Sequence, residues 1–104
     1  MTEEERKHFM RVEDFLTSAQ THSEPPSALT EPLRALWYAA KGDWRRAHLV
    51  AQEIPGTDGS WIHAHLHREE DDLGNARYWY AKSGHVESKA SIQDERRELI
   101  AAFL

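Results

Sequence analysis

The chain contains no cysteine, so it can form neither a disulfide bond nor a metal site built on thiolates. It is also poor in glycine and proline, with five and four residues among 104, and 39% of its residues are hydrophobic. This composition is typical of a folded helical protein rather than a disordered one. At this length we expect one modest hydrophobic core.

Long apolar runs are missing too, because the longest extends only over residues 35–40. A membrane-spanning helix needs about 20 apolar residues, and a signal peptide has a basic start, whereas this chain begins M-T-E-E-E. The sequence therefore predicts no membrane segment, no signal peptide and a cytoplasmic location. The formal net charge is −5, and we expect no nucleic-acid partner, because phosphate backbones are bound by dense lysine and arginine.

Apolar residues recur at helical spacing along most of the chain, and no segment alternates with a period of two. This pattern predicts an all-α fold of about six helices in a single domain over residues 1–104. The expected segments are a first helix over 2–20, a linker over 21–30, a first hairpin over 31–55, a second hairpin over 58–84 and a C-terminal helix over 91–104.

Helix ends carry their own signals. Gly42 can take the positive φ of a helix C-terminus, and Thr2 followed by Glu5 resembles a capping pair. Serine and aspartate accept hydrogen bonds from the free amides of a helix start. The residues expected in that role are Asp43, either Asp58 or Ser60, Asp72, and Ser91.

An internal repeat appears when the chain is shifted by 29 residues, which aligns Ala35 with Ala64, Asp43 with Asp72 and Ala47 with Ala76. Small residues at these places allow two antiparallel helices to approach closely. With Gly42-Asp43-Trp44 at the turn, residues 31–84 resemble the tetratricopeptide family. The resemblance implies two stacked antiparallel hairpins, which the N- and C-terminal helices would cap.

The stretch over residues 61–84 gathers three of the seven histidines and four of the seven tryptophans and tyrosines. Its segments W-I-H-A-H-L-H-R and N-A-R-Y-W-Y are similar to those of small helical proteins of bacteria and fungi, a likeness that implies no activity. We expect any binding or chemistry to lie here. Trp79 and Tyr80 are expected in the core, whereas Tyr78 lies on another face of its helix with Asn75.

Three interpretations of the histidines remain open. His63 and His67 lie about 40° apart around a helix axis, so they can pack in the core, or line a groove and bind a ligand or a partner's chain end. With Glu70, they also form a set that zinc accepts, to which His48 could contribute. A protease motif H-E-x-x-H is excluded, because Ala64 follows the first histidine. His65 points the opposite way and is expected at the surface.

These observations favour a non-catalytic binding or protein-interaction module with no cofactor, whose groove lies on the second hairpin. Its partner would be a protein or a small polar ligand, held by His63, His67, Asn75 and Tyr78. One alternative is a small metal-dependent hydrolase that uses zinc on His63, His67 and Glu70. Another is a structural subunit that forms homo-oligomers, with an apolar patch across Leu49 and Tyr78.

Overall fold

The computed structural model describes residues 11–104, and within them it contains six helices and no strand, which confirms the all-α prediction. The first part of the helix expected over 2–20, with Thr2 and Glu5, lies outside the described residues. The helices are α2 (Val12–Thr21), α3 (Glu31–Lys41), α4 (Trp44–Ala51), α5 (Gly56–Glu69), α6 (Leu73–Ser83) and α7 (Ile92–Phe103).

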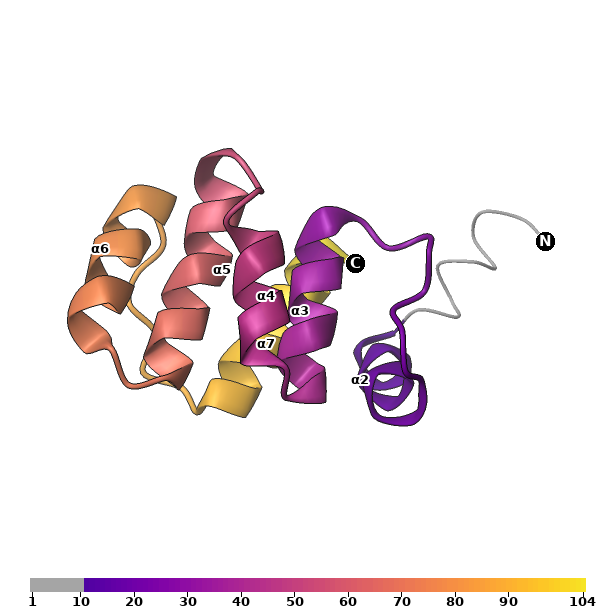
Figure 1. Cartoon of the computed structure of the whole chain (residues 1–104). Helices are drawn as coiled ribbons and strands as arrows, with labels where there is room; N and C mark the ends of the chain where they lie inside the picture. The colour runs from indigo at the N-terminus through magenta and orange to yellow at the C-terminus, as the bar shows by residue number, and fades with distance from the viewer. Residues whose placement is uncertain (1–10) are drawn as a thin grey trace.

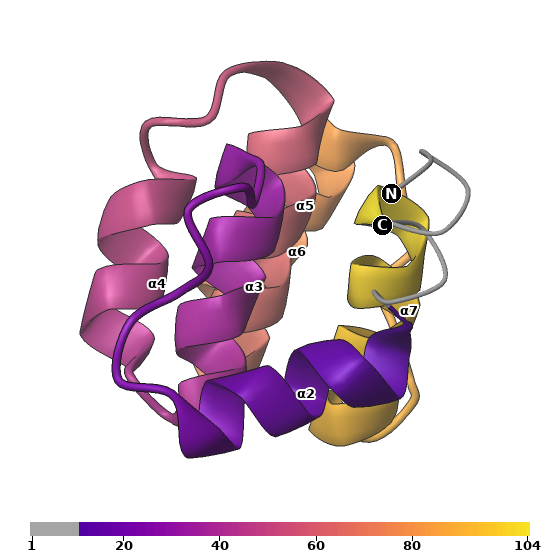
Figure 2. The same cartoon turned by 90° about the vertical axis from the view of Figure 1, so that its right-hand side faces the viewer.

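Two hairpins form the centre of the fold. Helices α3 and α4 pack against each other across a short turn, as do α5 and α6, and α4 then packs against α5 (Figure 1). Helix α7 lies against α3 and α5, while α2 runs crosswise over α3 and α7 (Figure 2). Because α3 is enclosed by α2, α4, α5 and α7, it is buried on several sides, and Trp37 in its middle is fully buried.

Most helix ends lie where the capping residues predict them. The side chains of Asp43, Asp72 and Ser91 accept hydrogen bonds from backbone amides three residues ahead, at 3.1, 3.3 and 3.0 Å. Gly42 closes α3 with φ 89°, a left-handed conformation that favours glycine. The turn chemistry of the sequence thus fixes both hairpins.

The start of α5 differs from the prediction. Neither Asp58 nor Ser60 caps this helix; it begins at Gly56, follows Pro55, and has no side-chain cap. The Ser60 hydroxyl instead donates to the Gly56 carbonyl at 3.2 Å. The chain passes so close here that a Cβ at Gly59 would lie 2.0 Å from the Ile54 carbonyl oxygen, so only glycine fits.

The core lies between the hairpins and the two outer helices. Its fully buried large side chains come from α2, α3, α5 and α7: Phe15, Leu36, Trp37, Ile62, Leu66, Leu99 and Ile100. Among the described residues, no helix combines the length and apolar character that crossing a membrane requires.

Candidate functional site

Helix α5 presents histidines on two opposite faces. His63 and His67 point toward α4 and meet His48, and these three residues are called here the imidazole cluster. His65 points toward α7 instead. Both faces are buried, because His63 and His67 are each 7% exposed and His65 is 0% exposed.

The rings of the imidazole cluster lie in contact. The His48 and His63 rings are nearly parallel, with centroids 4.9 Å apart, and the His67 ring centroid lies 5.4 Å from that of His48 and 5.7 Å from that of His63. Trp44 stacks on the outer face of His48 at 4.9 Å, and Trp79 of α6 meets His63 edge to face at 4.2 Å. Aromatic rings thus run without interruption from α4 across α5 to α6.

Two residues of the cluster, His48 and His63, have lowered pKa values. Burial, followed by the proximity of His48 and His67, lowers the pKa of His63 to about 4. Burial and His67 likewise lower the pKa of His48, against a smaller opposing effect of Glu70. A neutral imidazole has one nitrogen that donates a hydrogen bond and one that accepts.

The residues predicted to hold a metal are only partly brought together. His67 Nδ1 lies 2.7 Å from Glu70 Oε1, but among the described residues the donor atoms that lie within 4.8 Å of one another belong to His67, Glu70 and Asp72, without His63. Asp72 already caps α6 through Asn75. The lone pairs of an imidazole lie in the ring plane, so the parallel rings of His48 and His63 do not direct their nitrogens to one point.

His63 has a feature that the other two cluster members lack. Its Nε2 atom is buried and has no hydrogen-bond partner among the described residues. Buried polar atoms are nearly always paired, and leaving one unpaired costs about 1–3 kcal/mol. Among the described residues, His63 is therefore the cluster residue that has a buried ring nitrogen without a partner.

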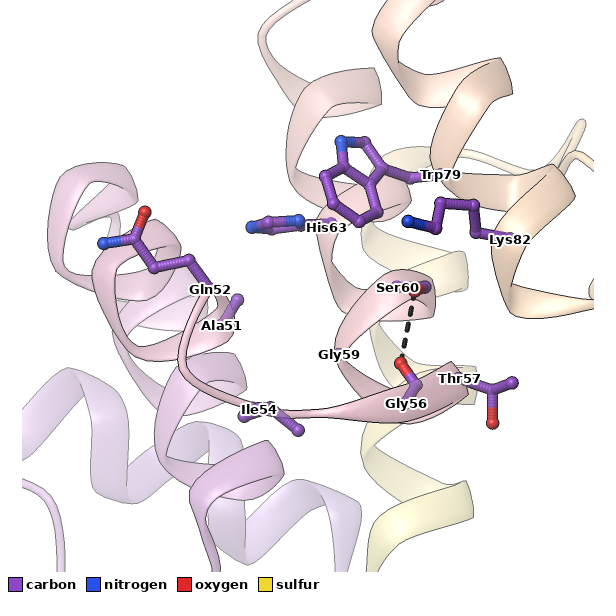
Figure 3. Close-up of a pocket in the computed structure, with 10 residues that line it drawn as sticks. All are labelled: Ala51, Gln52, Ile54, Gly56, Thr57, Gly59, Ser60, His63, Trp79 and Lys82. Atoms are coloured by element: carbon purple, nitrogen blue, oxygen red, sulfur yellow. Dashed lines mark hydrogen bonds between the residues drawn. The ribbon is translucent and has the colours of Figure 1, made fainter.

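A pocket of about 390 Å³ opens beside His63, between the end of α4, the start of α5 and the middle of α6. In Figure 3, Gln52 reaches it from the α4 side, Trp79 and Lys82 reach it from α6, and the His63 ring stands between them. The remaining lining residues form its floor and the first turn of α5: Ala51, Ile54, Gly56, Thr57, Gly59 and Ser60. This volume falls in the range of small-ligand sites.

Of the four predicted binding residues, only His63 lines this pocket. His67 lies one helical turn away, inside the imidazole cluster. Asn75 is exposed, and its amide nitrogen lies 3.5 Å from the Asp72 carboxylate. Tyr78 is 55% exposed and packs edge to face on Trp79 at 5.2 Å, outside the pocket.

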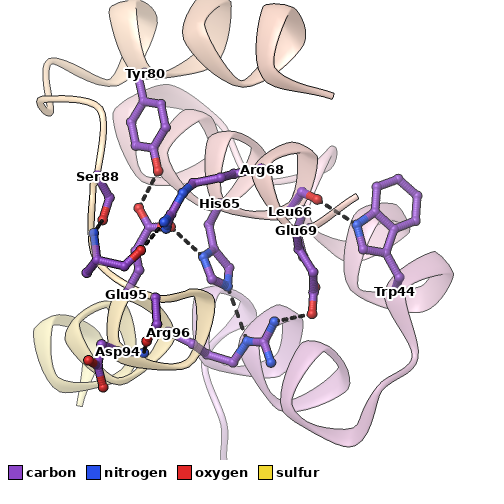
Figure 4. A network of polar contacts seen from close by, with 12 residues as sticks. Trp44, His65, Leu66, Arg68, Glu69, Tyr80, Ser88, Asp94, Glu95 and Arg96 are labelled. Atoms are coloured by element: carbon purple, nitrogen blue, oxygen red, sulfur yellow. Dashed lines mark hydrogen bonds and ion pairs between the residues drawn. The ribbon is translucent and has the colours of Figure 1, made fainter. Parts of the chain in front are cut away.

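The opposite face of α5 takes part in a network of hydrogen bonds and ion pairs with α6 and α7, called here the closed network (Figure 4). His65 Nε2 accepts a hydrogen bond from Arg96 Nε at 3.2 Å, so its Nδ1 carries the proton and donates to Glu95 Oε1 at 2.8 Å. Arg68 Nη1 donates to the same carboxylate at 3.0 Å, and the Tyr80 hydroxyl donates to its other oxygen. The expected surface position of His65 is thus wrong, because α7 covers this face.

The closed network keeps its carboxylate ionised. Burial alone would raise the pKa of Glu95, but hydrogen bonds from His65, Tyr80 and Arg68 together lower it. Burial and the Glu95 carboxylate raise the pKa of Tyr80. No buried polar atom of this network lacks a hydrogen-bond partner among the described residues, in contrast to the face that carries His63.

The sequence prediction missed Lys82, Gln52 and the first turn of α5 as parts of the site. The signal for Lys82 was available, since residues three apart share a helix face and Lys82 follows Trp79 at that spacing. Its ammonium indeed lies 5.2 Å from the Trp79 ring centroid. Gln52 carries no such signal, because it comes from the neighbouring hairpin.

Comparison of the chain with family models, curated proteins and solved structures finds no match. The tetratricopeptide resemblance consequently stays a prediction.

Proposed function

We propose that this protein is a non-catalytic binding module whose ligand occupies the pocket beside His63. The ligand would be a small polar molecule or the chain end of a partner protein. The proposal rests on His63, which lines this pocket and whose buried Nε2 has no partner among the described residues, because a ligand that displaces a covering side chain would supply the missing hydrogen bond.

The other residues that line the pocket also favour the binding of a ligand. Trp79 offers a flat apolar wall, and Lys82 supplies a charged group whose nitrogen points toward His63 in Figure 3. A few directed polar groups beside aromatic area are characteristic of ligand sites.

The same groups are poorly arranged for catalysis. No carboxylate lies among the lining residues, and the Ser60 hydroxyl donates to a backbone carbonyl rather than to His63. A nucleophile needs an adjacent base, and that base needs a group that orients it. The hydrolase alternative would require His63 to leave its stack on His48 and join the donor atoms of His67 and Glu70.

The experiment is a ligand screen by ¹H–¹⁵N NMR of the isotope-labelled chain, using mixtures of small polar fragments and short peptides. We expect ligands that shift the signals of the Trp79 indole and of the Gly56 and Thr57 amides. Trp79→Ala should abolish the shifts of the Gly56 and Thr57 amides, because it removes the pocket wall. The matched truncation Leu49→Ala, at an exposed position of α4 outside the pocket, should leave them unchanged.

A screen that yields no ligand at these signals would contradict the proposal. Shifts that survive Trp79→Ala would place binding elsewhere on the molecule. The subunit alternative makes a different prediction, namely a mass in analytical ultracentrifugation that rises with protein concentration and falls in the Tyr78→Ala variant.

A further inference from the structure

The pocket beside His63 is lined by groups that share a preference for negative charge. Lys82 places its ammonium at the pocket, with the Trp79 and Tyr78 ring centroids 5.2 and 5.4 Å away. Lys82 has no ion pair with a carboxylate among the described residues. Its charge is therefore available to a ligand.

The first turn of α5 contributes donors of a second kind. The first four amides of a helix have no partner inside it, and the helix dipole adds positive potential there. The start of α5 has no side-chain cap, as is also true of α2 and α3, but here two residues of the uncapped turn, Gly56 and Thr57, line the pocket. Asp58 also lies in this turn, but its exposed side chain does not line the pocket.

The third donor is His63 itself. Its neutral ring can carry a proton on Nε2, which is buried and has no acceptor among the described residues, so a ligand that displaces a covering side chain can accept it. A helix start alone would not define a site, but here a buried unpaired side chain and an unpaired ammonium meet at the same pocket. Donors from α5 and α6 thus converge beside an apolar wall formed by Trp79 and Ile54.

We propose that the pocket binds a carboxylate that is attached to an apolar or aromatic group. The carboxylate lies between Lys82, His63 and the first turn of α5, and the apolar group packs on Trp79. This inference rests on the binding function proposed above and specifies the chemical class of its ligand. A free organic acid and the C-terminus of a peptide share this chemistry.

The test compares matched charged and neutral probes by NMR titration of the labelled chain. The first pair is 4-phenylbutyrate and 4-phenylbutyramide, and the second is a pentapeptide that ends in phenylalanine with a free or an amidated C-terminus. We expect each acid to bind at least about tenfold more tightly than its amide, because a charged hydrogen bond contributes that much. The stronger of the two acids identifies the source as a free acid or a chain end.

Variants of single residues test which side chains recognise the negative charge of the ligand. Lys82→Gln should weaken binding of the acids by about five- to tenfold and leave the amides unchanged. Lys89→Gln makes the same charge change at an exposed position outside the pocket and should have no effect. His63→Phe keeps a ring in the stack but removes both nitrogens, so it should weaken the acids while far-ultraviolet circular dichroism stays unchanged.

Binding of a carboxylate has a further signature at His63. The ring pKa, followed by NMR, should rise when the acid is bound, because a negative charge beside the ring favours its protonation. If acids and amides bind equally at the Trp79 signals, the pocket binds ligands but the carboxylate inference is overturned. If no probe or fragment shifts these signals, the binding function itself fails.

Discussion

The two buried faces of α5 differ in how completely the chain satisfies its own polar groups. On the face toward α7, His65 uses both ring nitrogens, and Glu95 accepts hydrogen bonds from three side chains. On the face toward α4, His63 is almost as deeply buried, yet its Nε2 has no partner. One helix thus carries a histidine whose hydrogen bonding is complete and another whose hydrogen bonding is not.

This difference separates a structural role from the binding role proposed above. The closed network joins α5, α6 and α7, so its hydrogen bonds contribute to holding these helices together. The imidazole cluster joins α4 to α5 by ring contacts that do not require the nitrogen of His63. Loss of the network should therefore harm folding, and loss of the His63 nitrogens should mainly harm binding.

The largest effect is expected from Glu95→Gln. Removing one partner of a buried ion pair leaves Arg68 uncompensated, so we expect a loss of about 3 kcal/mol in the free energy of unfolding, measured with urea. Glu98→Gln is the control, because it lies on the same helix and is exposed. A loss below about 1 kcal/mol would show that the closed network is not what secures α7.

A matched pair of histidine variants compares the two faces directly. His65→Phe removes a donor to Glu95 and an acceptor from Arg96, and should cost about 2–3 kcal/mol of unfolding free energy. His63→Phe breaks no hydrogen bond within the chain and keeps ring contacts, so it should cost less than about 1 kcal/mol. Equal losses in the two variants, measured in the same urea series, would contradict the division of roles.

The pH dependence of stability provides a third comparison. The pKa of His63 is about 4 in the folded protein, below its ordinary value of 6.5. Between these values the unfolded chain binds the proton more readily, so stability should fall as pH decreases from 6.5 to 4, by about 2 kcal/mol from this residue. Subtracting the His63→Phe profile from that of the natural protein isolates this effect, since Glu95 and His48 titrate in both. A flat difference would show that His63 is not desolvated.

The smallest effect is expected at Tyr78, which is 55% exposed and lies outside the pocket. Tyr78→Ala should change the free energy of unfolding by less than about 0.5 kcal/mol. It should also leave the affinity for the acidic probes within about twofold, since an aromatic ring outside the pocket contributes no direct hydrogen bond to them. A larger loss of affinity by NMR titration would include Tyr78 in the binding surface, as the sequence alone predicted.

Local chemistry explains what the sequence could predict. Helix periodicity and the capping residues Asp43, Asp72 and Ser91 act within a few positions, so the helices and both hairpin turns followed from them. The closed network could not be predicted from the sequence, because His65 and Glu95 are 30 residues apart. In addition, adjacent charges such as Glu95 and Arg96 ordinarily indicate a solvated helix face. His63 was predicted as a site residue, but its unpaired nitrogen depends on how the two hairpins pack, whereas Lys82 could have been found from its spacing to Trp79.

The contact between Gly59 and the Ile54 carbonyl, where any side chain at position 59 would collide, has a consequence for recognising related proteins. The same turn brings the end of α4 over the start of α5, and His63 follows Gly59 by one helical turn. A glycine four residues before a histidine, soon after a Pro-Gly helix start, is thus a compact search pattern for chains with the same pocket. A chain that has the histidine but a larger residue at that glycine should lack the pocket, however similar its helices are.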